Sequence, residues 1–291
     1  MSRNNFWDCS LVFTNDFTIA ANMVRECIAL KYHGVLLDCR RNYTDLIENE
    51  GVNNDYLKAV KKLQDLYGSQ IQIKKRITIE TESKSKLKDN NPDETIIKIT
   101  KLLSTQKLKL LEQFDLISIS IESIEELIKC CNEWKIVDLI NINKFKKKNV
   151  TMNTLLIQSL RNAIKENNNK FFEISLQSLL SISDTNNYFA IQFFHLIAQV
   201  IGPNNIIVSS GALQSLYCRK PLDLIQLTTF CFKSSQKRCI EKNVYQMISV
   251  IKNRRLVQDC IWSIQIDEMS NEEKNKLIPM ISSEAVQEKS V

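Results

Sequence analysis

Histidine is scarce in this sequence, with two among 291 residues, and this scarcity limits the metal chemistry available to the chain. His33 and His195 stand far apart, and neither belongs to a His-x-His or His-Glu-x-x-His motif. Catalytic zinc sites draw on such histidine groupings, so a histidine-ligated metal enzyme is disfavoured. We expect His195, inside an apolar helical stretch, to be a core residue, and His33 to lie at the end of a strand away from a barrel's active-site face.

Glycine is also rare, with five residues, and no P-loop, G-x-G-x-x-G or G-x-S-x-G motif occurs. These motifs use glycine so that the backbone can approach a phosphate closely or turn sharply beneath a nucleophile. Their absence disfavours nucleotide-binding enzymes of the common types and hydrolases with a nucleophile elbow.

No C-x-x-C pair occurs among nine cysteines, and several cysteines, such as Cys27 and Cys130, fall in apolar runs. This pattern predicts reduced core thiols in an intracellular protein and no zinc site. No segment approaches the roughly 18 apolar residues of a membrane span. The first residues, MSRNNFWDCSLVF, carry no clear signal-peptide pattern, so we expect neither secretion nor membrane association.

Positive charge is unevenly distributed along the chain, whose net charge is +6. Residues 201–260 hold nine Lys/Arg against three acids, an excess equal to that of the whole chain, whereas 261–291 hold three Lys against six acids. A basic zone followed by an acidic tail is typical of nucleic-acid binding with a solubilising tail. The alternative is that the cations only form solvated helix faces.

Short β-type runs alternate with helical patterns over most of the chain. Repeated strand–helix alternation predicts crossover connections and a parallel sheet. An open doubly wound sheet and a closed barrel both fit, and we favour an α/β, TIM-like barrel of about seven parallel strands in a single domain, residues 1–260, followed by a mobile tail, 261–291. The expected strands are 6–13, 34–39, 71–80, 114–121, 137–142, 171–176 and 205–210; the expected helices include 17–32, 123–134, 188–202 and 234–255.

One segment, NNIIVSSGALQSLYCRKPLDL (204–224), combines features of a phosphate site. Its apolar strand ends in Ser209-Ser210-Gly211, and Arg219-Lys220 precede a proline that can begin a helix. Two hypotheses compete for this segment: a catalytic phosphate pocket, or a docking surface for a polyanion.

Three carboxylates, Asp38, Glu80 and Glu122, lie at the carboxyl-terminal ends of expected strands and could together hold Mg²⁺. Each also suits a helix cap or a loop. A metal-dependent phosphoesterase on the same barrel is therefore the alternative enzyme hypothesis, and a scaffold that binds only proteins is a third.

Residues 171–227 resemble the carboxyl-terminal half of the thirty-kilodalton protein subunit of ribonuclease P and ribonuclease MRP. The resemblance rests on Phe172-Glu173-Ile174, a long helix from about Tyr188, the strand end Val208-Ser209-Ser210-Gly211, and Cys218-Arg219. Looser resemblance extends upstream to IQIKKRITIE (71–80), with Arg76 at the family's arginine, and to 114–143.

The sequence departs from the family pattern in two places. Asn186-Asn187 replace a basic pair before the long helix, and residues 144–170 lack the family's arginine–glycine turn. Four lysines in that segment could serve as phosphate contacts instead: Lys144, Lys146, Lys147 and Lys148.

The resemblance implies a barrel related to the polymerase-and-histidinol-phosphatase superfamily that has no catalytic metal and no cofactor. In this family the RNA cleaves precursor tRNA at its 5′ leader, and the protein supports the RNA. The implied partners are ribonuclease P RNA, a small ferredoxin-like subunit, other ribonuclease P/MRP proteins and, indirectly, precursor tRNA. The implied location is the nucleus, particularly the nucleolus.

The candidate RNA-binding residues follow from the resemblance and from the basic zone. They are Arg76, Ser209, Ser210, Arg219, Lys220, Lys233, Lys237, Arg238, Lys252, Arg254 and Arg255.

Overall fold

The computed structural model describes the chain in ranges separated by gaps. The chain divides into two compact units, residues 1–249 and 250–291, and the barrel lies in the first. The predicted acidic tail, 261–291, lies outside the described residues. These are 5–48, 54–81, 111, 113–121, 124–142, 158–159, 161–164, 170–177, 195, 198–232 and 236–256.

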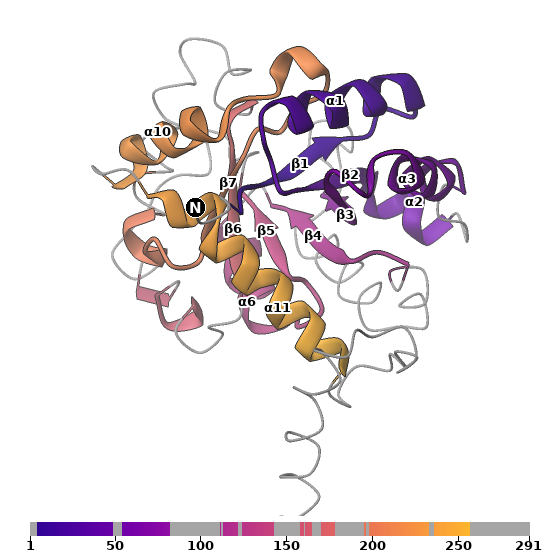
Figure 1. Cartoon of the computed structure of the whole chain (residues 1–291). Coiled ribbons are helices and arrows are strands. Elements are labelled where there is room, and N and C mark those ends of the chain that lie inside the picture. The colour runs from indigo at the N-terminus through magenta and orange to yellow at the C-terminus, as the bar shows by residue number, and fades with distance from the viewer. Residues whose placement is uncertain are drawn as a thin grey trace, which may run out of the picture. The chain divides into compact units, whose positions relative to one another are not determined.

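Seven strands form one sheet in which every neighbouring pair is parallel and the order in space is the order in sequence. Each strand lies at its predicted place, so the predicted α/β barrel is confirmed (Figure 1). The strands are β1 (Trp7–Val12), β2 (Gly34–Asn42), β3 (Gln72–Glu80), β4 (Leu116–Ser120), β5 (Leu139–Asn141), β6 (Phe171–Ser175) and β7 (Ile206–Ser209).

The sheet nearly closes where β1 meets the residues that follow β7. Leu11 forms a parallel bridge with Ala212, and the Val12 amide donates a hydrogen bond to the Ala212 carbonyl over 2.8 Å. The pairing of β1 with β2 shifts register between Asp8 and Leu11, which indicates a bulge. Bulges bend strands and re-aim side chains at barrel rims, and here the bulge lies beside the closure.

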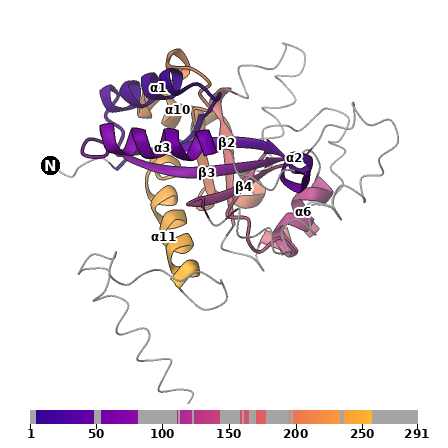
Figure 2. The same ribbon diagram turned by 90° about the vertical axis from the view of Figure 1, so that its right-hand side faces the viewer.

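Helices cover the outside of the barrel, and α1 and α3 lie side by side there (Figures 1 and 2). Arg25 Nε on α1 donates to the Tyr67 hydroxyl at the end of α3 over 2.7 Å. Among the described residues, the α-helices include α1 (Phe17–Ala29), α2 (Tyr43–Glu48), α3 (Asn54–Tyr67), α6 (Ile124–Asn132), α10 (Pro221–Phe232) and α11 (Lys242–Leu256), and the 3₁₀ turns include η2 (Ser215–Tyr217) and η3 (Lys237–Ile240).

The sequence explains the start and the buried face of α1. The Asp16 carboxylate accepts hydrogen bonds from the amides of Thr18 and Ile19, which satisfies donors that an uncapped helix would leave free. Met23 and Cys27 lie four residues apart on one face of α1, and both are fully buried.

The predicted helix 234–255 is wrong as one element, because it is divided into η3 and α11. Glu241 interrupts it with φ −126° and ψ −83°, outside helical values. Of the predicted helix 188–202, the structure describes His195 and residues 198–202, of which His195 and 198–201 are helical.

The cysteines follow the prediction wherever the structure describes their side chains. Each is a buried, unpaired thiol: Cys9, Cys27, Cys39, Cys130, Cys131, Cys218 and Cys239. Among the residues that the structure describes, no helix combines the length and apolar character required to cross a bilayer.

Candidate nucleic-acid interface

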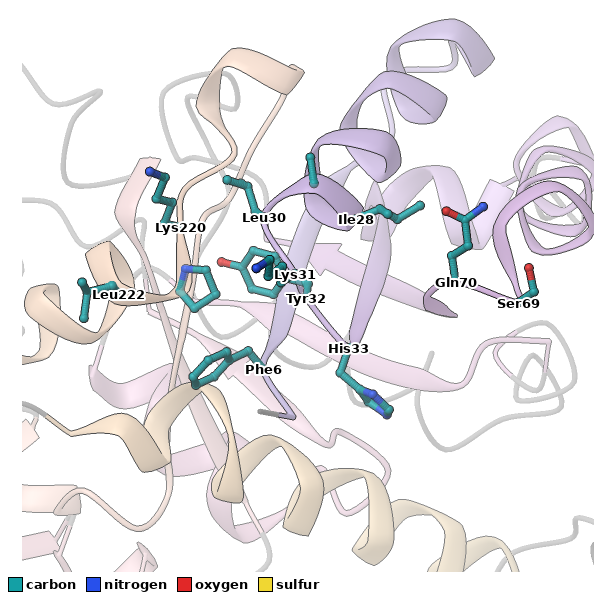
Figure 3. A pocket seen from close by; sticks show the side chains of 12 residues that line it. Phe6, Ile28, Leu30, Lys31, Tyr32, His33, Ser69, Gln70, Lys220 and Leu222 are labelled. Atoms are coloured by element: carbon teal, nitrogen blue, oxygen red, sulfur yellow. The ribbon is translucent and has the colours of Figure 1, made fainter. Parts of the chain in front are cut away.

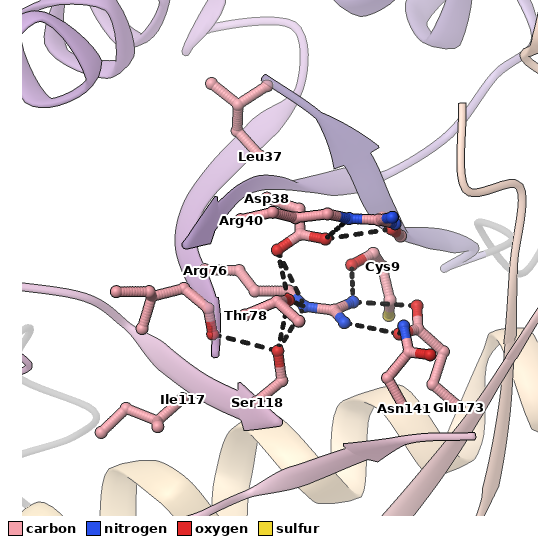
Figure 4. A network of polar contacts seen from close by, with 12 residues as sticks. Cys9, Leu37, Asp38, Arg40, Arg76, Thr78, Ile117, Ser118, Asn141 and Glu173 are labelled. Atoms are coloured by element: carbon pink, nitrogen blue, oxygen red, sulfur yellow. Dashed lines mark hydrogen bonds and ion pairs between the residues drawn. The ribbon is translucent and has the colours of Figure 1, made fainter. Parts of the chain in front are cut away.

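The interior of the barrel is polar, and Arg76 on β3 lies at its centre (Figure 4). Its guanidinium reaches across the barrel to Glu173 on β6, where Nη1 and Nη2 donate to the two carboxylate oxygens over 2.8 and 2.5 Å. Nη1 also donates to the Cys9 carbonyl on β1 over 2.7 Å. This paired geometry is the strongest that arginine and a carboxylate form, and it joins three strands.

The remaining side of the guanidinium faces a second carboxylate. Arg76 Nε lies 3.4 Å from Asp38 Oδ1 on β2 and donates to the Ser118 hydroxyl on β4 over 3.0 Å. Asp38 also accepts hydrogen bonds from Thr78 and from Arg40. The interior therefore holds a connected network in which buried positive and negative charges face one another.

Arg76 is fully buried, and its donors contact the protein. Burial disfavours the charged guanidinium, but Asp38 and Glu173 outweigh this effect and hold the pKa of Arg76 above its usual value. The residue is thus a permanent internal cation. The prediction that Arg76 contacts RNA is wrong, because no phosphate can reach a side chain that is enclosed by the barrel.

The alternative Mg²⁺ site does not assemble either. Asp38 is paired with Arg76 in the register of β2 and β3, whereas Glu80 is paired with Asn42, four residues farther along. At about 3.3 Å per residue, the backbone positions of Asp38 and Glu80 are about 13 Å apart along the strand direction. Glu122 lies outside the described residues. Within those residues, no three His, Cys, Asp or Glu side chains gather as metal ligands.

The end of β7 holds the barrel together and is closed to solvent. Ser209 and Ser210 are 0% and 1% exposed. The Ser210 amide donates to Asp8 Oδ1 on β1 over 3.1 Å, and the Ser210 hydroxyl accepts from the Ala212 amide. The predicted phosphate contacts of Ser209 and Ser210 are therefore wrong, because these groups lie inside the closure between β7 and β1.

Asp8 is the acidic partner at this closure. Burial raises its pKa from 3.8 to about 6, although hydrogen bonds from Ser210 and Ser10 act in the opposite direction. Its Oδ2 has no hydrogen-bond partner among the described residues. The carboxylate is consequently held in an environment that favours its neutral form.

The chain then runs from the carboxyl-terminal to the amino-terminal end of the barrel. Ala212 lies beside the end of β1, whereas Pro221, at the start of α10, lies near Phe6, which precedes β1. The Tyr32 hydroxyl fixes this route by donating to the Arg219 carbonyl over 2.8 Å. Arg219 and Lys220 thus lie at the opposite end of the barrel from Ser209.

Lys237 on η3 joins Lys220 at this amino-terminal end. Its ammonium lies 5.0 Å from the centre of the Phe6 ring and 3.2 Å from Glu241. Arg238, half-buried, donates to the Asn243 side chain over 3.3 Å. The structure therefore gathers part of the predicted basic set around Phe6.

The structure describes the side chains of only some of the other predicted cations. Lys252 is exposed on α11 in the unit 250–291. Arg254 and Arg255 lie on the same helix, but their side chains are outside the described set, and Lys233 lies outside it altogether. Lys144, Lys146, Lys147 and Lys148 are also outside the described residues.

Sequence reasoning missed two residues of this end, Lys31 and Phe6, which are distant in sequence from the basic zone. Lys31 directly follows α1, and Phe6 precedes β1. The amino-terminal ends of parallel strands meet at one edge, and this rule could have placed both residues beside His33. His33 does lie at this end, as predicted.

Fold and site together define a parallel α/β barrel with an internal arginine–carboxylate network and cations at its amino-terminal end. This chain is similar to a chain in the cryo-EM structure of archaeal ribonuclease P with mature tRNA, with a TM-score of 0.59, 14% identity, and coverage of 91% of this chain and 99% of that chain.

Two enzyme structures share the fold. A putative 2-pyrone-4,6-dicarboxylic acid hydrolase from Pseudomonas putida has a TM-score of 0.51 at 13% identity and covers 86% of this chain and 99% of its own. A chain from the crystal structures of YwqE from Bacillus subtilis and CpsB from Streptococcus pneumoniae, metal-dependent tyrosine phosphatases, has a TM-score of 0.50 at 11% identity. The match covers 84% of this chain and 94% of that chain. No curated protein matches the chain.

The family model for RNase P subunit p30 matches residues 7–256. The chain therefore belongs to the ribonuclease P subunit p30 family, whose members are protein subunits of a ribonuclease in which RNA is the catalyst. This agrees with the expectation that the chain has no independent activity.

Proposed function

We propose that this chain binds ribonuclease P RNA by phosphate contacts from its basic zone, residues 201–260, and stabilises the RNA for 5′ maturation of precursor tRNA. The family match over residues 7–256 carries the proposal. The surplus of cations in the zone supports it, because phosphate contacts supply most of the affinity of proteins for RNA irrespective of sequence.

The described cations of this zone suit phosphate contact because they reach solvent. Lys220, Lys237 and Lys252 are exposed, and Arg219 is half-buried. The pairing of Lys237 with Glu241 is an exposed i,i+4 ion pair of small strength, so a phosphate can compete for the ammonium.

A small ferredoxin-like subunit is the protein partner in this proposal. Leu213 and Leu216, on the segment after β7, are 39% and 76% exposed. Exposed apolar side chains close together mark interfaces. We assign these two leucines to the contact with that subunit, and we extend the proposal to ribonuclease MRP and to a nuclear, nucleolar location on the family resemblance.

Affinity purification of the tagged full chain from its own cells tests the RNA assignment. We expect ribonuclease P RNA to be enriched over an unrelated tagged protein, and the small subunit to accompany it. A chain that is intact and soluble in the extract but recovers no ribonuclease P RNA would contradict the proposal.

Paired substitutions test the protein contact separately. The change Leu213→Ser with Leu216→Ser should reduce recovery of the small subunit at least several-fold, because it removes the exposed apolar pair. Leu66→Ser is the matched control, since Leu66 is 52% exposed on α3. Equal recovery in both variants would remove these leucines from the interface.

A further inference from the structure

An open pocket of about 800 Å³ lies at the amino-terminal end of the barrel (Figure 3). It runs from the start of α10, past the end of α1, to the turn before β3. Phe6, which precedes β1, forms part of its wall. No residue of this pocket belongs to the polar interior around Arg76, so the pocket is a separate site.

The pocket is positively charged. Lys31 and Lys220 line it, and none of its twelve lining residues is Asp or Glu. Lys237 adds a third cation against the ring of Phe6. Apolar and amide groups, among them Leu222 and Gln70, complete the lining. Charge of one sign beside apolar and hydrogen-bonding groups suits a nucleotide, which carries a phosphate and an aromatic base.

Lys31 has an unfavourable backbone conformation for a lysine. Its φ is 64°, in the left-handed region where glycine is favoured. It ends α1 in a turn in which its amide donates to the Ile28 carbonyl and the Tyr32 amide donates to the Cys27 carbonyl. Helices commonly place glycine at this position. A lysine in this position, at a conformational cost, points to a role for its side chain at the pocket.

We infer that this pocket binds an unpaired segment of ribonuclease P RNA, with a backbone phosphate between Lys31 and Lys220 and a base against Phe6 and Leu222. The inference rests on the proposed function. An unpaired segment is required because only an unstacked base can enter a concave pocket and contact an aromatic ring. The start of α10 at Pro221 lies on the phosphate side, but Asp223 in its first turn offsets the positive end of the helix, so Lys31 and Lys220 supply the charge there.

The test measures the affinity of the full chain for ribonuclease P RNA and for an oligouridine of about 8 nucleotides over a range of salt. Lys31→Gly is the informative change because glycine suits the left-handed backbone while the cation is lost. We expect unchanged or higher thermal stability, several-fold weaker binding, and a log–log salt slope reduced by about 0.7. In the double variant Lys31→Gly with Lys220→Ala, the total reduction of the slope relative to the wild type should be about 1.4.

Lys61→Ala is the matched control, because Lys61 is an exposed lysine on α3 that does not line the pocket. If the wild-type chain binds neither RNA, the proposed function fails. If the wild type binds and both pocket variants keep its affinity and slope, the pocket assignment fails while the proposed function stands. Variants that lose a protein subunit but keep RNA affinity would make the pocket a protein contact and overturn the inference.

Discussion

Arg76 illustrates how one residue can determine what a barrel interior does. Barrels are usually filled by layers of branched apolar side chains. Here a guanidinium occupies the centre, with Glu173 on one side and Asp38 on the other. The guanidinium and the two carboxylates bond to one another, so these interior groups are occupied by contacts within the protein. Arg76 joins β3 to β1, β2, β4 and β6, and the proposed RNA contact is assigned to residues outside this interior.

Replacement of Arg76 should therefore affect folding. We expect Arg76→Met to lower the free energy of unfolding by about 3–5 kcal/mol, because it leaves Glu173 and Asp38 buried without their partner. Equilibrium urea unfolding measures this loss. Arg161→Met, at an exposed position, is the control and should cost under about 0.5 kcal/mol. Similar losses in the two variants would show that the network contributes nothing.

Asp8 should make stability depend on pH. Its pKa is about 6 in the folded chain and near 3.8 when unfolded, so the folded state binds the proton more tightly. The stability contribution is present below about pH 4 and is lost as the pH rises through about 6, an effect of about 3 kcal/mol. Asp8→Asn should remove this loss and stabilise the chain at pH 7.

Unfolding at a series of pH values between about 4 and 7 measures this effect. The difference between Asp8→Asn and the wild type should be small at pH 4 and should grow towards pH 7. Asp65→Asn on α3, where the carboxylate is exposed, provides the control for the loss of one charge. A constant difference across the range would refute the assignment of the titration to Asp8.

At the scale of elements, the end of β7 depends on Gly211. Its φ is 67°, and a β-carbon there would lie 2.8 Å from the Ser175 hydroxyl on β6. Gly202 provides a matched position, with φ 78° but nothing within 4 Å of its added β-carbon. Both glycines suit left-handed backbone, but only Gly211 also requires the absence of a side chain.

We expect Gly211→Ala to destabilise the chain more than Gly202→Ala. The strain of a positive φ costs about 1–2 kcal/mol in each variant, and the contact with Ser175 adds about 1–3 kcal/mol at Gly211. Thermal and urea unfolding of the two variants give the comparison. Equal losses would mean that β6 moves aside without cost and that the close approach is unimportant.

The sheet could be predicted because most strands are buried apolar runs between polar connections, although β3 also carries Lys74, Lys75 and Arg76. The exact ends of the strands were harder to predict from the sequence. β2 continues to Asn42, although the apolar run ends at Cys39, because its polar residues pair along β3. A strand residue that faces the barrel interior can be polar when it hydrogen-bonds to a residue on another strand. A single sequence does not show which residues are paired in this way.

The candidate site was predicted only in part, for the same reason. Lys220 and Lys237 were identified by the local excess of charge, whereas Lys31 is one of many lysines in the sequence. Arg76 is an RNA-binding candidate in the sequence, which does not show its internal partner, because Glu173 lies 97 residues away. Only the closure of the barrel brings that carboxylate to it and converts the arginine into a core residue.

At the scale of the whole molecule, the charges highlighted in the described part of the chain lie in two places. The interior pairs Arg76 with carboxylates, whereas cations such as Lys220 and Lys237 lie exposed around Phe6. The internal charges are fixed by partners and contribute little to long-range attraction. The basic zone holds nine Lys/Arg against three acids, so its net surplus of positive charge supplies the field that attracts a polyanion.

This arrangement predicts how RNA affinity depends on salt. Each phosphate neutralised adds about 0.7–0.9 to the slope of log affinity against log salt. Arg219→Ala should therefore reduce the slope by about one unit, and the combined change of Lys252, Arg254 and Arg255 to alanine by about two to three units. Affinity should fall with little change in sequence preference, because phosphate contacts do not read bases.

Negatively charged residues of the acidic tail provide the control for this salt titration. Glu272→Gln with Glu273→Gln should leave the slope unchanged or strengthen binding slightly, because these carboxylates repel phosphate. A salt titration of RNA affinity for the wild type and the three variants, with folding checked by circular dichroism, makes the comparison. Unchanged slopes in the folded Arg219 and triple variants would show that these four cations form only a solvated surface. The pocket cations are tested separately, by the salt slopes of Lys31→Gly and of Lys31→Gly with Lys220→Ala.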